Sequence, residues 1–345
     1  MNTDLIEIKS NKSPIIICGM HRSGTSLIAQ MLEACGLFLG NENQLLGPTI
    51  VDNPSGYWEF KDIVLFSERL LKSVGGSWKE ISCLYSEFWI SEDLKRKLLE
   101  AEDILEPLIQ SGKVWGWKDP RATVMLPFWR HLFPNFKLIV CVRNPLEVAF
   151  SLSKRIGGHV DFHKGLKLWR DYYELLGGGI QNNDVIYVHY ELMMAKPDSE
   201  IRRLCDFTDL SPSDKMINKA KERIKSDLYR GVVPDEQLFQ FDELPYGIIE
   251  IYSHLCEGAN NKFSEDSLDV NQRVQNYQLA LEKLLKISTK SFDSYNLMLE
   301  KRKLQVDRLK QKLFEKEKEV LFYSMSKSWR ITRPLRKLNK LIKGE

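Results

Sequence analysis

The sequence lacks the features of membrane-spanning, zinc-binding and disulfide-linked proteins. Its 345 residues contain no apolar run approaching the roughly 18 residues that cross a bilayer. The six cysteines are scattered and form no Cys-x-x-Cys pair, which argues against a metal or disulfide framework and predicts reduced thiols. The first residues are polar and mixed in charge, unlike a signal peptide. These absences together predict a cytoplasmic protein.

The composition is that of an ordinary globular protein, with an uneven distribution of charge. Hydrophobic residues make up 43% and charged residues 28%, which excludes a disordered or collagen-like chain. The net charge is +3, but residues 301–345 alone carry +10, so the preceding 300 residues carry −7. A basic end on an acidic body indicates an anionic partner for that end alone, and nothing in the body points to nucleic acid.

Four short apolar runs predict strands that are buried on both faces of a parallel sheet. Helical patterns separate them, and strands that alternate with helices are typical of an α/β fold with a central sheet and flanking helices. The expected strands are Ile15–Cys18, Val114–Trp117, Lys137–Val142 and Asp184–Val188. The expected helices are Thr25–Cys35, Pro145–Lys154 and Phe162–Leu176, the last ended by three glycines.

The pattern changes after about residue 250, where we expect the α/β domain (residues 1–250) to end. Residues 251–270 are rich in polar residues, as in a linker. Residues 271–322 contain no Gly or Pro and place apolar residues every seven positions from Leu285 to Val320. This spacing predicts a coiled coil that would join two chains in a homodimer, and a long helix packed on its own body is the alternative.

Residues 323–345 form a basic tail. After Pro334, apolar residues including Leu335, Leu338 and Leu341 share one helical face, and Lys and Arg cover the rest. A basic amphipathic helix suits an anionic membrane surface, which would place the protein at the inner face of the membrane. A solvated tail without a membrane role is the alternative.

A candidate anion-binding loop follows the first expected strand. Gly19 and Gly24 have the G-x-x-x-x-G spacing of nucleotide-binding loops, in which backbone N–H groups and a helix N-terminus face a phosphate. The lysine that normally follows the second glycine is absent, and Arg22 provides the cation instead. An ordinary strand–helix turn is the alternative interpretation.

The third expected strand also differs from its counterpart in nucleoside triphosphatases. Such enzymes usually end a strand beside the loop in an Asp that helps to hold Mg²⁺, whereas this strand ends in Arg143. The sequence therefore predicts positive charge where a metal-dependent enzyme has a metal ligand. This pattern suits an anionic nucleotide bound without a metal ion.

These motifs resemble sulfotransferases that use 3′-phosphoadenosine-5′-phosphosulfate (PAPS), over roughly residues 12–235. The family loop that cradles the 5′-phosphosulfate matches His21-Arg22-Ser23-Gly24-Thr25-Ser26, with His where Pro is common. The family Arg-Asn-Pro motif matches Arg143 and implies that Arg143 and Ser151 bind the 3′-phosphate. The resemblance further implies Tyr190 near the adenine and, on a weaker match, Arg230 near the 3′-phosphate.

The resemblance also implies the catalytic groups. Arg22 would stabilise the leaving phosphate oxygen, and Glu59 lies in a segment similar to the one that supplies a catalytic Glu in carbohydrate and tyrosyl-protein sulfotransferases. Asp119 is the alternative base, with Lys118 beside it to contact the sulfuryl group. A structural ion pair within Lys118-Asp119-Pro120-Arg121 is the competing interpretation.

We therefore expect a metal-independent sulfotransferase that moves a sulfuryl group from PAPS to a hydroxyl or amine. Glu59, in place of a catalytic His, favours a carbohydrate or glycolipid acceptor. Two other hypotheses remain at this point: a small-molecule kinase that uses ATP, and an inactive nucleotide-binding scaffold whose function lies in its coiled coil.

Overall fold

The computed structural model describes residues 13–49, 55–81, 94–154, 160–180, 184–224 and 244–260, together with Val233, Leu238 and Phe241. All of them belong to the first of two units of the chain, residues 1–283. The predicted coiled coil (271–322), the basic tail (323–345) and Arg230 lie outside the described residues. In the described part, no helix is long and apolar enough to cross a membrane.

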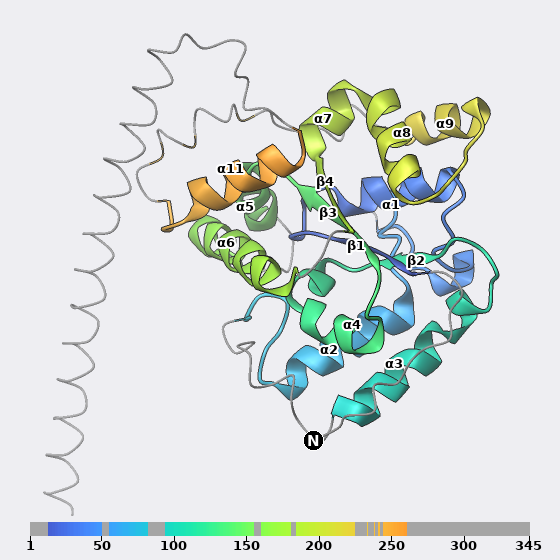
Figure 1. The fold of residues 1–345 in the computed structure, drawn as a ribbon. Helices are drawn as coiled ribbons and strands as arrows, with labels where there is room; N and C mark the ends of the chain where they lie inside the picture. Colours follow the sequence, from blue (N-terminus) through green and yellow to red (C-terminus); the bar gives the residue numbers. More distant parts are fainter. Residues whose placement is uncertain are drawn as a thin grey trace, which may run out of the picture. The chain divides into compact units, whose positions relative to one another are not determined.

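A four-stranded parallel sheet forms the centre of the fold, in the order β2-β1-β3-β4 (Figure 1). The strands are β1 (Ile15–Cys18), β2 (Gly116–Lys118), β3 (Lys137–Val142) and β4 (Val185–His189). The predicted parallel sheet is confirmed; β2 and β4 begin one or two residues later than expected. Because all strands are parallel, their carboxyl ends meet at one edge.

Helices cover both faces of this sheet, which gives the α/β layers that the sequence predicts (Figure 1). One face carries α1 (Thr25–Ala34), α8 (Pro197–Phe207) and α9 (Asp214–Lys221). The other carries α4 (Leu126–Leu132), α5 (Pro145–Ser153) and α6 (Phe162–Gly179). The remaining helices are α2 (Lys61–Ser73), α3 (Leu94–Ile109), α7 (Tyr190–Ala195) and α11 (Ile248–Gly258), with short 3-10 helices at Glu42–Gln44 and Pro120–Val124.

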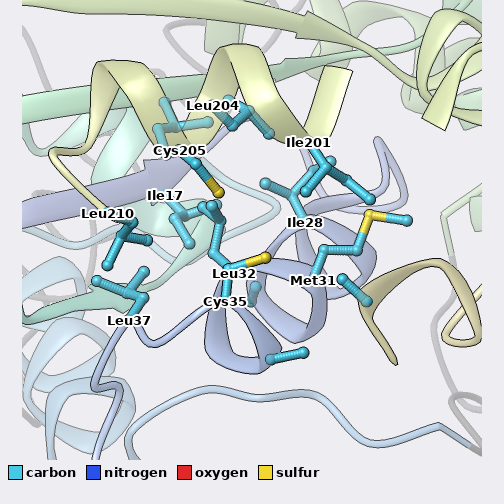
Figure 2. Packing of buried hydrophobic residues seen from close by; sticks show 14 of the residues in the cluster. Ile17, Ile28, Met31, Leu32, Cys35, Leu37, Ile201, Leu204, Cys205 and Leu210 are labelled. Atoms are coloured by element: carbon cyan, nitrogen blue, oxygen red, sulfur yellow. The ribbon is translucent and has the colours of Figure 1, made fainter. Parts of the chain in front are cut away.

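Buried apolar residues of β1, α1 and α8 form one core, which holds α1 against the sheet. Figure 2 shows Ile17 of β1 among Leu32 of α1 and Leu204 and Cys205 of α8. All four side chains are at most 2% exposed. Since the N-terminus of α1 follows the loop after β1 directly, this apolar contact holds the helix that the loop enters.

Helix α6 continues three residues further than predicted. The sequence predicts an end at Leu176, but the helix runs to Gly179, and the N–H of Ile180 donates to the carbonyl oxygen of Leu176. Glycine weakens a helix without preventing it, and the earlier turns of α6 are anchored by burial. Gly165, for example, faces Ala149 of α5 so closely that a Cβ would lie 2.9 Å from the Ala149 Cα.

The expected domain boundary at residue 250 falls inside a helix. Helix α11 occupies the first part of the segment that we interpreted as a linker, and it buries Tyr252 and Cys256. The Tyr252 hydroxyl lies 2.9 Å from the His189 Nε2 at the end of β4. The apolar spacing of α11 is helical, and the many polar residues that follow it obscured that signal. The α/β body therefore continues to residue 260.

The burial of His189 near Arg143 makes stability depend on pH. Burial, and secondly the charge of Arg143, lowers the pKa of His189 to about 4 from its usual 6.5. The unfolded chain then binds the proton more readily than the folded chain. The contribution of neutral His189 to the free energy of unfolding is therefore fully present above pH 6.5 and is lost as the pH falls toward 4. When the pH is lowered from 7 to 5, the free energy of unfolding of wild type, measured with urea, should fall by about 2 kcal/mol more than that of His189→Gln. His254→Gln, at an exposed position, is the control, and equal pH slopes for all three proteins would contradict this assignment.

The packing of α8 on α1 predicts a difference between two leucine substitutions. Leu204→Ala removes a fully buried side chain and should lower the free energy of unfolding by about 2–5 kcal/mol. Leu99→Ala, on α3, removes a side chain that is 46% exposed and should change it by less than about 1 kcal/mol. Urea unfolding measures both, and similar losses would show that the core does not lie where the structure places it.

Candidate functional site

The loop after β1 takes a tight, left-handed path. Gly19 (φ 130°), Arg22 (φ 73°) and Gly24 (φ 89°) all have positive φ, which a non-glycine residue such as Arg22 adopts only at a cost. A Cβ on Gly19 would lie 2.4 Å from the carbonyl oxygen of Cys141. Gly24 is the N-cap of α1 and offers no capping side chain. The first N–H groups of α1 therefore face the loop, as in an anion-binding turn.

Two buried hydroxyl groups hold this loop from distant parts of the chain. The N–H of Gly19 donates to Thr123 Oγ1 (2.8 Å), and the N–H of Met20 donates to the Tyr173 hydroxyl (3.2 Å). That hydroxyl also lies 2.6 Å from the Cys141 carbonyl oxygen and 3.3 Å from Ser23 Oγ. Burial raises the pKa of Tyr173, which keeps its proton in place as a donor. Sequence analysis missed both residues, because no local spacing links them to a loop more than 100 residues away.

The structure brings four predicted nucleotide-binding residues together beside the loop. Arg22 Nε donates to Ser151 Oγ at 2.8 Å, and Arg143 Nη1 donates to the Arg22 carbonyl oxygen at 3.2 Å. The Arg143 guanidinium lies over the ring of Tyr190, 4.5 Å from its centre. That ring also packs on Gly24, where a Cβ would lie 2.5 Å from Tyr190 Cδ2. Two guanidinium groups, a hydroxyl and an aromatic face in one place suit a phosphorylated nucleotide.

A buried carboxylate that the sequence analysis did not identify belongs to this group. Glu147 Oε2, in the first turn of α5, accepts a hydrogen bond from Arg143 Nε at 2.7 Å. Its other oxygen accepts from the N–H of Val233 at 2.8 Å. Neighbouring Asn144 caps α5 by accepting from the N–H of Leu146. The two residues are four positions apart, but Arg143 precedes the N-cap of α5, so helical periodicity does not predict this contact.

A second charged group lies at the carboxyl end of β2. Lys118 Nζ donates to Glu59 Oε1 at 2.5 Å, and Arg121 Nη1 lies 3.6 Å from Glu59 Oε2. The side chains of Lys118 and Glu59 are only 1% and 7% exposed. The segment before Glu59 also touches the phosphate-loop helix, because Ser26 Oγ donates to the Tyr57 carbonyl oxygen at 3.2 Å. Glu59 thus stands in an ion pair beside the candidate nucleotide site.

Asp119 has a structural role in this group. Its Oδ1 caps the 3-10 helix Pro120–Val124 by accepting from the N–H of Arg121 (2.9 Å), and it pairs with Arg121 Nη1 (2.8 Å). Arg121 also pairs with Glu68 at 3.0 Å. Asp119 is fully buried. This pairing matches the competing interpretation, a structural ion pair within Lys118-Asp119-Pro120-Arg121.

The other predicted loop residues contribute to the shape of the site. The His21 ring lies 4.8 Å from the ring of Trp78, and Ser23 and Thr25 are buried. Among the described residues, no group of three His, Cys, Asp or Glu side chains is arranged to hold a metal ion. The roles assigned to these residues by resemblance remain predictions.

The close packing of Gly24 on Tyr190 predicts a strong effect of a single methyl group. Gly24→Ala places a Cβ in a left-handed backbone and against the ring, and it should lower the free energy of unfolding by at least about 1 kcal/mol. Gly177→Ala in α6 adds a Cβ that meets nothing within 4 Å and should be neutral or stabilising. Thermal unfolding of both variants measures this contrast, and a neutral Gly24→Ala would contradict the loop geometry.

Comparison with known proteins identifies relatives of this chain. Two proteins described as "Putative protein-tyrosine sulfotransferase", from Caenorhabditis briggsae and Caenorhabditis elegans, are 30% and 32% identical over 108 and 107 residues, 29% of this chain and 39% and 41% of theirs. The protein-tyrosine sulfotransferase A of Caenorhabditis elegans is 23% identical over 59% of this chain and 52% of its own. The chain thus spans about two fifths to one half of the length of these relatives.

A solved structure and a family model can also be compared with this chain. Sulfotransferase STF9 from Mycobacterium avium is 15% identical, with a TM-score of 0.44 over 71% of this chain and 75% of that chain. The model of the sulfotransferase family matches residues 14–214, more than half of the chain. The matched range contains the loop of Arg22, the ion pair of Glu59 with Lys118, and the contacts of Arg143. The chain therefore belongs to the sulfotransferase family.

Proposed function

We propose that this chain transfers the sulfuryl group of PAPS to an acceptor hydroxyl, with Glu59 as the base that takes the acceptor proton. Membership of the sulfotransferase family implies PAPS as the donor. One observation carries the proposal: a buried Glu59–Lys118 ion pair stands next to the loop at which Arg22 and Arg143 meet. Membership of the sulfotransferase family argues against the kinase hypothesis. The inactive-scaffold hypothesis is the alternative that the activity assay below tests.

The residues around the loop would hold the two charged ends of the donor. Arg143 and Ser151 suit the 3′-phosphate, because a guanidinium and a hydroxyl can donate to one phosphate together. Tyr190 offers its ring beside them for the adenosine. The loop N–H groups and Arg22 suit the 5′ end, where Arg22 would offset the negative charge that develops on the leaving oxygen. PAPS itself supplies the activated sulfuryl group.

Glu59 and Lys118 would act at the acceptor side. The carboxylate of Glu59 is held at a fixed place by Lys118 and Arg121, which meets the positional demand on a general base. Lys118, within hydrogen-bond distance of that carboxylate, can also donate to a sulfuryl oxygen. The base and the cation are thereby positioned by the same contact, at the carboxyl edge of the sheet.

For the acceptor, we propose a tyrosyl hydroxyl of a protein or peptide. The names of the relatives support this choice over the carbohydrate or glycolipid that the sequence predicts. Transfer of labelled sulfate from PAPS to tyrosine-containing peptides, surface glycans and lipids compares the acceptors in one assay. Labelled peptide alone is the expected result. Labelled glycan or lipid alone would restore the carbohydrate prediction, and no labelled acceptor of any kind would contradict the proposed function.

Two carboxylates that both pair with Arg121 provide a test of the base. Glu59→Gln should lower kcat by about 10²–10⁴-fold while binding of the product adenosine 3′,5′-bisphosphate (PAP) is kept, because the amide cannot accept the proton. Glu68→Gln alters a carboxylate that is 53% exposed and should leave kcat within about twofold. Steady-state kinetics and calorimetry with PAP give both quantities. Equal activity of the two variants would exclude Glu59 as the base.

A further inference from the structure

Glu147 is a buried carboxylate whose two oxygens serve two different parts of the chain. One oxygen binds Arg143 Nε at 2.7 Å, and the other binds the N–H of Val233, 86 residues further on, at 2.8 Å. The side chain is only 3% exposed. Asn144 Nδ2 reaches the carbonyl oxygen of the same Val233 at 3.3 Å. The start of α5 therefore holds both polar backbone groups of Val233.

Arg143 is oriented from several directions at once. Its carbonyl oxygen accepts from Trp169 Nε1 at 3.2 Å, and its Nη1 donates to the Arg22 carbonyl oxygen. The face of its guanidinium lies against Tyr190. Glu147 adds the ion pair at Nε, and no hydrogen bond among the described residues uses Nη2. These contacts restrain the plane of the guanidinium from several sides.

We propose that Glu147 is a positioning residue: it sets the Arg143 guanidinium for the 3′-phosphate of the donor and joins this arginine to the chain at Val233. The proposal rests on the proposed function, in which Arg143 binds that phosphate. It adds a requirement that the binding motif does not contain, namely that a buried anion must stand beside the phosphate-binding cation.

Two effects of opposite sign make the proposal testable. A carboxylate near a phosphate repels it, so removal of the negative charge of Glu147 alone would strengthen phosphate binding. Loss of the orientation of Arg143 would weaken it, because a guanidinium binds phosphate well only when its donors are aligned. Glu147→Gln keeps an oxygen that can accept from Val233 and removes the charge that pairs with Arg143. The sign of its effect therefore separates positioning from simple repulsion.

The experiment is calorimetric titration of the full chain with PAP and with adenosine 5′-phosphate, which lacks the 3′-phosphate. Glu147→Gln should lower the affinity for PAP about tenfold and leave the affinity for adenosine 5′-phosphate within about twofold of wild type. Arg143→Ala should show the same selective loss, and the double variant little more, because both changes affect one contact. Glu174→Gln, the exposed i,i+4 partner of Arg170, should alter neither affinity.

Each other outcome is decisive. If Glu147→Gln bound PAP as tightly as wild type or more tightly, or lost affinity equally for both ligands, the positioning role would be wrong. The proposed function would still stand, provided that wild type prefers PAP to adenosine 5′-phosphate. A wild type that binds PAP no more tightly than adenosine 5′-phosphate would overturn both. If Glu147→Gln fails to fold, Glu147→Asp, which withdraws the carboxylate by one methylene, should show the selective loss of PAP affinity, and full affinity in that variant would refute the proposal.

Discussion

The contact between Arg143 and the loop after β1 joins the parts of this protein on which its chemistry depends. Arg143 follows β3, Tyr190 follows β4, and Arg22 lies in the loop between β1 and α1. A parallel sheet brings all three strand ends to one edge, where Arg143 binds the Arg22 carbonyl oxygen and covers the Tyr190 ring. If this contact were lost, the two guanidinium groups would have no common site.

Charge compensation is the second requirement of the site. Burying arginine and lysine side chains is costly unless each has an anionic partner with good geometry. Glu147 pairs with Arg143, and Glu59, Asp119 and Glu68 surround Lys118 and Arg121. The same contacts that offset this cost also fix the directions of the charged groups. Stability and orientation therefore come from one set of interactions, and carboxylates near an anion-binding site are consistent with its function.

The sequence predicts the central strands well where burial requires a run of apolar residues. The strands Ile15–Cys18 and Lys137–Val142 have the predicted bounds, because a run that is buried on both faces is apolar throughout. The end of α6 and the boundary at residue 250 were misplaced. In both cases glycine or polar residues suggested an end to regular structure. The helical hydrogen bonds of α6 continue through its glycines, and burial of Tyr252 and Cys256 holds α11.

The spacing of residues in the sequence predicts part of the candidate site. The motifs around Arg22, Arg143 and Ser151 predict residues that the structure brings within hydrogen-bond distance. The pairing of Glu59 with Lys118 and the support of the loop by Thr123 and Tyr173 join residues 59 or more positions apart. No periodicity or spacing in a single sequence specifies such contacts, since they arise only when the sheet brings the segments together.

The most direct measurement of the central claim is a crystal structure of the chain with PAP bound. We expect the 3′-phosphate within hydrogen-bond distance of Arg143 and Ser151, and the 5′-phosphate against Arg22 and the N–H groups of the loop after β1. A nucleotide bound at another edge of the sheet, or bound here with its phosphates directed away from both arginines, would contradict it.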